Sequence, residues 1–165
     1  MAANDKRATA DAFSEKLNAT PAGGDEADRF RAADDRLKAL SAAAISTIRG
    51  LSGADAEQDL PPEIVEALTC WCFLHDEQPA SVASCAKLAE DPDDFRLVGM
   101  SSLEYMPEEE LTEISQRVGV LDPEVARKRS VAVAEVACAM IEWLQAALAL
   151  RRWAQEQRAE QAESS

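Results

Sequence analysis

The residues best suited to chemistry in this chain are Cys70, Cys72 and His75, which lie close together. Two thiols and an imidazole are typical zinc ligands, but no second cysteine pair stands at zinc-finger or zinc-ribbon spacing. Cys70 and Cys72 also lie within the apolar run 68–74, where small thiols pack well in a core. The sequence therefore predicts buried thiols, no metal and no cofactor. His75 follows at a predicted helix end, where a cap or surface role is the ordinary one.

Carboxylates are the other candidate ligating or catalytic groups, and Glu108, Glu109 and Glu110 form a dense run. Consecutive side chains on a helix point in different directions, so this run does not converge on one cation. Pro107 before it marks a helix start, where acidic side chains suit the dipole. The chain also lacks a Gly-x-x-x-x-Gly-Lys-Ser/Thr phosphate loop and a recognisable nucleophile–base pairing. We therefore expect no catalytic residues, and a binding module rather than an enzyme.

The net charge of the chain limits the classes of partner that it can bind. The 165 residues carry a formal net charge of −14. Such a surface opposes binding to nucleic acid, which depends on Lys and Arg to neutralise phosphates. No apolar stretch approaches the length of a membrane span, and the first residues lack the profile of a secretory signal, so we expect a cytoplasmic protein without membrane contact. The positive charge is concentrated in two runs, 127–129 and 151–152.

Two series of apolar residues at coiled-coil spacing, which we call seams, predict the helices that position the charged side chains. The first consists of Phe30, Ala33, Leu37, Leu40, Ala44, Ile48 and Leu51, and the second of Val133, Val136, Met140, Trp143, Ala147, Leu150 and Ala154. A seam needs a partner to bury it, and the nearest partner for each is the other. Alanine is abundant and no strand-like alternation persists, so the sequence predicts an all-α fold. We expect an antiparallel coiled-coil hairpin capped by a small bundle of about six helices.

Helix breakers divide the chain into four predicted segments. Residues 1–24 end in a stretch rich in Pro and Gly and are expected to be flexible. Residues 25–51 form the first coil helix, 52–132 a helical tip, and 133–165 the return helix with a frayed carboxyl end. Within the tip, Pro62, Ser81, Pro107 and Pro123 mark predicted helix starts, the last with Asp122 as its N-cap.

The order of these signals resembles the microtubule-binding tip of the dynein heavy-chain stalk. That pattern has a coil helix, a Pro-Pro opening the first tip helix, an Ala-Lys helix ending in an Asp-Pro-x-Phe-like turn and a Leu-x-x-Tyr-like step. A Pro-Glu-x-Val helix then leads to Ser-x-Ala, and the return coil has an aliphatic pair before x-Trp. The matching stretches here are 60–65, 86–95, 103–105, 123–132 and 140–143. Their order and separations carry the resemblance, which spans about residues 33–155.

The resemblance implies a non-catalytic, microtubule-binding piece of a motor ATPase whose ring is absent from this chain. It also implies tubulin as the partner, a place in the cytoskeleton of a cilium or flagellum axoneme, and coupling of track binding to small shifts in coil register. Seam alanines such as Ala33 and Ala147 interlock less than leucine, which brings alternative registers close in energy; alanine also simply permits close packing. The alternative is an acidic helical surface that binds a leucine-rich-repeat light chain or adaptor instead of tubulin.

The candidate tubulin-binding residues follow from the resemblance and the positive charge. They are Arg127, Lys128, Arg129, Arg151 and Arg152, with Arg117 and Lys87 as lesser candidates. Arginines near helix ends are also commonly just solvated. The chain departs from the family pattern in three ways. Glu66 lies near a position that often carries lysine, and the spacing from Ser130 to Trp143 is about one helical turn longer than in the family. The net charge is also unusually negative for a microtubule-binding protein. Reversed charge at Glu66 is expected to weaken encounter with acidic tubulin.

Overall fold

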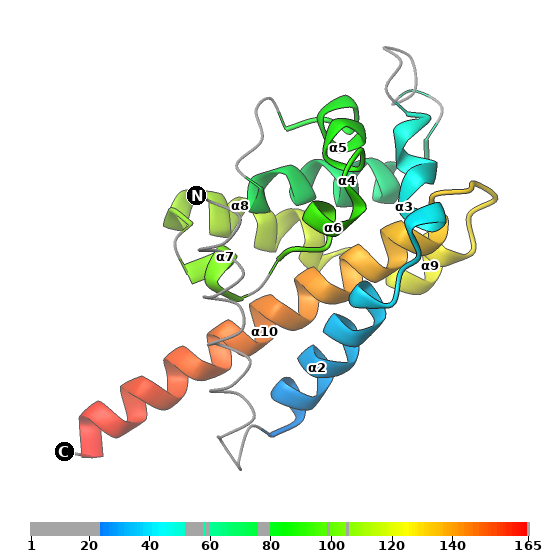
Figure 1. Ribbon diagram of the computed structural model, residues 1–165. Helices are drawn as coiled ribbons and strands as arrows, with labels where there is room; N and C mark the ends of the chain where they lie inside the picture. Colours follow the sequence, from blue (N-terminus) through cyan, green and yellow to red (C-terminus); the bar gives the residue numbers. More distant parts are fainter. Residues whose placement is uncertain are drawn as a thin grey trace.

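The computed structural model describes residues 24–51, 58, 60–75, 80–98, 100–104 and 106–164, and every regular element among them is a helix (Figure 1). The all-α prediction is therefore confirmed. Residues 1–23, predicted to be flexible, and Tyr105, part of the Leu-x-x-Tyr-like step, lie outside the described residues. The helices are α2 (Gly24–Lys38), α3 (Ala42–Arg49), α4 (Pro62–Leu74), α5 (Val82–Leu88), α6 (Pro92–Phe95), α7 (Met100–Glu104), α8 (Glu108–Gly119), α9 (Pro123–Arg127) and α10 (Ala134–Ser164).

The long helix α10 forms the centre of the body (Figure 1). Helix α2 runs beside it in the opposite direction, while α4 and α8 contact both α10 and each other. Most side chains in the first turns of α10 are consequently buried, whereas Glu135 is exposed. The buried ones are Val136, Ala137, Met140, Ile141, Trp143, Leu144, Ala146 and Ala147. One continuous core draws on all three predicted ranges 25–51, 52–132 and 133–165. No helix in the described ranges is long and apolar enough to cross a membrane.

Trp143 of α10 makes the main side-chain contacts with α2. Its ring meets Phe30 edge-on at 5.6 Å between centroids, and its indole Nε1 donates a hydrogen bond of 3.0 Å to the Asp34 carboxylate. Next to it, the Arg36 guanidinium pairs with Glu142 at 2.6 Å. Helices α2 and α10 thus lie against one another around Phe30 and Trp143. Because α4 packs on the same part of α10, with Trp71 5.7 Å from Trp143, the paired helices share the core of the surrounding bundle.

The first predicted coil helix, 25–51, is two helices in the structure. Helix α2 ends at Lys38, and α3 begins at Ala42 with Ser41 as its N-cap. The Leu40 carbonyl, which a continuous helix would use internally, accepts a hydrogen bond from Arg96, and the Lys38 ammonium donates to the Val98 carbonyl at 3.1 Å. The hydrogen bond from Arg96 thus satisfies a carbonyl that the break leaves without a helical partner, and the one from Lys38 ties the end of α2 to the segment after α6.

We expect Ser41→Ala to lower the free energy of unfolding by about 1 kcal/mol, because its Oγ accepts the Ala44 N–H at 3.0 Å and that donor would lose its partner. Urea unfolding followed by circular dichroism measures the change. Ser46→Ala is the matched control in the same helix, since the Ser46 hydroxyl only donates back to the Ala42 carbonyl at 2.7 Å. An equal loss in both variants would contradict a capping role.

The other helix ends follow local sequence signals more closely. Ser81 caps α5, and Asp122 caps α9 ahead of Pro123, as predicted. Asp91, in the stretch matched to an Asp-Pro-x-Phe-like turn, caps the short helix α6. At the carboxyl end, α10 continues to Ser164, where fraying was predicted. Side-chain acceptors at these positions satisfy the first backbone donors of each helix.

Candidate functional site

The basic triplet lies where α9 ends. Arg127 is the last residue of α9, Lys128 is its C-cap, and Arg129 is in the following turn. Arg127 pairs with Glu124 at 2.5 Å, and Arg129 pairs with Glu63 in the first turn of α4. Two of the three cations are therefore already balanced by carboxylates.

The electrostatics of this end of the molecule reflect those pairings. The hydrogen bond from Arg129 lowers the pKa of the Glu63 carboxyl below its ordinary value, so Glu63 stays ionised and ties α4 to the turn after α9. Lys128 is exposed and, within the described part of the chain, makes no ion pair. Of the triplet, Lys128 offers the charge that is available to a partner.

Two other predicted residues, Glu66 and Arg117, meet one another. The Arg117 guanidinium donates to both Glu66 carboxylate oxygens, at 2.6 Å and 3.2 Å, and pairs with Glu113 at 3.3 Å. The hydrogen bonding with Glu66 raises the pKa of Arg117 above its ordinary value. This pair links α4 to α8. Neither side chain presents an isolated charge, because each is engaged by the other.

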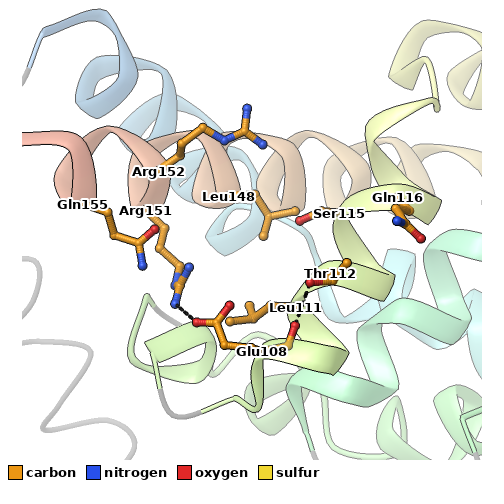
Figure 2. Close-up of a pocket in the computed structure, with 9 residues that line it drawn as sticks. All are labelled: Glu108, Leu111, Thr112, Ser115, Gln116, Leu148, Arg151, Arg152 and Gln155. Carbon is orange, nitrogen blue, oxygen red and sulfur yellow. Dashed lines mark hydrogen bonds and ion pairs between the residues drawn. The ribbon is translucent and has the colours of Figure 1, made fainter.

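The second basic run lies beside a hollow of about 290 Å³ between α8 and α10 (Figure 2). Arg151 points into it and pairs with Glu108 at 3.1 Å, over a floor that includes Leu111 and Leu148. Figure 2 shows Arg152 turned away from Glu108. At 1.5 Å per helical residue, the start of α10 and Arg151 are about 25 Å apart. The two basic runs therefore form two separate sites.

A second hollow, about 450 Å³ in volume, lies between the α2–α3 break and the helices α9 and α10. Leu40 and Ala44 line it from one side, and Arg127 and Cys138 from the other. The remaining basic candidate, Lys87, is exposed in the last turn of α5. The structure thus distributes the sequence-predicted residues over several faces instead of collecting them in one patch.

The cysteines are all buried and reduced. Burial raises the pKa of Cys70 to about 12 and that of Cys138 to about 11. Both thiols are therefore protonated at neutral pH, and neither is activated as a nucleophile. No group of three or more His, Cys, Asp or Glu side chains within the described ranges is arranged to hold a metal ion.

Sequence reasoning did not foresee the ion pairs that hold this site. The partners Arg129 and Glu63 are 66 positions apart, and Arg117 and Glu66 are 51 apart. Neither pair belongs to a periodic pattern. The sequence therefore does not indicate which acidic residue pairs with which arginine. No protein-family model, curated protein sequence or solved structure matches this chain.

Proposed function

We propose that this chain is a microtubule-binding module of the dynein stalk-tip type, without catalytic chemistry of its own, from an axonemal heavy chain. The observation that carries the proposal is the antiparallel contact of α2 with α10 through Phe30 and Trp143. Its second support is the order of elements between them: a Pro-Pro start at α4, an Asp-Pro start at α6 and a Pro start at α9, followed by a long return helix.

The positions of the helix ends suit that role. Helix α2 begins and α10 ends on the same side of the body, with α10 extending beyond it, while α9 and the starts of α4 and α10 lie at the opposite end (Figure 1). A coiled coil built on α2 and α10 would leave from the first side. The opposite end, which carries Lys128 beside the Arg129–Glu63 pair, would then face tubulin.

Binding by such a surface should be weak and sensitive to salt. The chain carries a net charge of −14, and the acidic microtubule surface repels it at long range. Arg127 and Arg129 are balanced by Glu124 and Glu63, so little positive charge remains at this end. Attraction therefore depends on Lys128 at short range, and added salt screens it within about a Debye length of 10 Å at 0.1 M.

Cosedimentation with microtubules at low ionic strength tests the proposal. We expect the wild-type chain to bind and Lys128→Glu to weaken binding about tenfold, because it reverses the available charge at the contact surface. Arg152→Glu is the matched control: it reverses an exposed cation at the other basic run and should change binding less than about twofold. Absence of binding at low salt, or equal losses in both variants, would contradict the proposal.

The internal pairing of the arginines favours a second candidate, an acidic surface for a light chain or adaptor. Glu108 and Glu109 are exposed at the start of α8, and Arg151 is engaged by Glu108. A basic or leucine-rich-repeat partner would meet carboxylates there. A pull-down from flagellar extract separates the two candidates: recovery of a light chain without tubulin, lost in Glu109→Lys, supports the second and opposes the first.

A further inference from the structure

Two buried thiols from different helices meet between α4 and α5. Cys72 and Cys85 are both 0% exposed, and a hydrogen bond joins their side chains. The Ser81 carbonyl lies between them: it accepts the Cys85 N–H at 3.0 Å and lies 3.4 Å from the Cys72 sulfur. This shared carbonyl fixes the first turn of α5 against the last turn of α4, and so holds the two cysteines next to each other.

The other two cysteines have different surroundings. Cys70 is two residues from Cys72, which places it about 200° around α4. Its charged neighbours are Arg117 and Glu113 of α8 and Glu66 of α4. Cys138 lies on α10, with its sulfur 3.7 Å from a Glu142 oxygen. Of the four cysteines in the chain, only Cys72 and Cys85 face one another.

We propose that Cys72 and Cys85 form an intramolecular disulfide when the protein meets hydrogen peroxide. One thiol, as thiolate, attacks a peroxide oxygen; the O–O bond breaks, water is released and a sulfenic acid forms on that sulfur. The second sulfur then attacks the sulfenyl sulfur, the S–O bond breaks and a second water leaves. The two thiols lose two electrons and two protons, and one peroxide is reduced to two waters.

The surroundings set the rate and the product. Burial and the hydrogen bond with Cys72 raise the pKa of Cys85 well above its ordinary value, so thiolate is scarce and the reaction is slow. Because the Cys72 and Cys85 side chains are hydrogen-bonded to each other, a sulfenic acid on one is captured by the other before a second peroxide reaches it. The disulfide then joins α4 to α5 and closes the loop 72–85, and loops of this length give a substantial gain in stability.

Peptide mapping of the peroxide-treated full chain tests the proposal. A glutamate-specific protease cuts after Glu66, Glu77 and Glu90, which separates peptide 67–77, with Cys70 and Cys72, from peptide 78–90, with Cys85. We expect the intact mass to fall by about 2 Da and the two peptides to stay linked until reduced. Thermal unfolding of the oxidised chain should be about 5 °C or more higher than that of the reduced chain.

Three single variants identify the sulfurs involved. Cys70→Ser is the matched control on the same helix and should keep the linked peptides, whereas Cys72→Ser and Cys85→Ser should lose them. The mapping of the wild-type chain stands even where a variant folds poorly. A link through Cys70, addition of oxygen to Cys72 or Cys85 without a link, or four thiols that react only after unfolding would each overturn the proposal.

Discussion

Replacing Trp143 with alanine should lower the free energy of unfolding by about 4 kcal/mol, the range found for deletion of a large buried aromatic side chain. The Trp143 ring is fully buried and contacts Phe30 of α2 and Trp71 of α4, with centroid distances of 5.6 and 5.7 Å. Its removal also leaves Asp34 without the indole donor at 3.0 Å. Urea denaturation followed by circular dichroism gives the value directly.

Trp153→Ala is the control on the same helix. Trp153 is only partly buried, so its loss should cost no more than about 1 kcal/mol. A similar loss from both substitutions would mean that the contact of α2, α4 and α10 at Trp143 is not the main support of the fold. It would also remove the observation on which the proposed stalk-tip architecture depends.

Glu66→Lys should destabilise the protein by about 2 kcal/mol, less than the loss of a fully buried ion pair because both partners are partly exposed. The substitution removes the acceptor of two Arg117 hydrogen bonds, of 2.6 and 3.2 Å, and places a second cation against the guanidinium. Urea unfolding measures the loss. Glu113→Lys is the control, because Glu113 is more exposed and only 3.3 Å from Arg117, and it should cost less than about 1 kcal/mol.

Exchanging the two charges measures the interaction between Glu66 and Arg117 separately from the contacts that each makes with other residues. The double variant Glu66→Lys with Arg117→Glu restores opposite charges and should recover about half of the lost stability. If the double variant is as unstable as the sum of its two single variants, Glu66 and Arg117 do not interact. Any effect of Glu66→Lys on microtubule binding has to be measured where the variant is fully folded, since the substitution changes the α4–α8 contact itself.

The sequence predicted the helix starts well because their signals are local. Ser81 and Asp122 are capping residues, and Pro62 and Pro123 occupy first turns, so each start is decided by neighbours in the chain. The break at residues 39–41 has one such signal, the capping residue Ser41, but the apolar pattern hides it. The apolar spacing continues across it from Leu37 through Leu40 to Ala44, and the hydrogen bond that replaces the helical one comes from Arg96.

The sequence of α10 already indicated that this helix packs against more than one neighbour. A helix that pairs along one seam is apolar on one side only, whereas α10 also carries Ala137, Ile141 and Leu144 off the predicted seam, all of them buried. A helix with so wide an apolar surface is expected to pack against several neighbours in a bundle. The ion pairs of the candidate site could not be predicted, because Glu63 and Arg129 meet only through the packing of α4 against the turn after α9.

The division of the first coil segment at Ser41 has a mechanical consequence. Because α2 and α3 are joined by a short non-helical link, α2 cannot act as a rigid rod that pushes on α3. Its end is instead clamped sideways, by Lys38 to the Val98 carbonyl and by Arg96 to the Leu40 carbonyl. A load applied along α2 would therefore pass sideways to α10, through the Trp143–Asp34 and Arg36–Glu142 contacts, and to the segment after α6, instead of passing straight into α3.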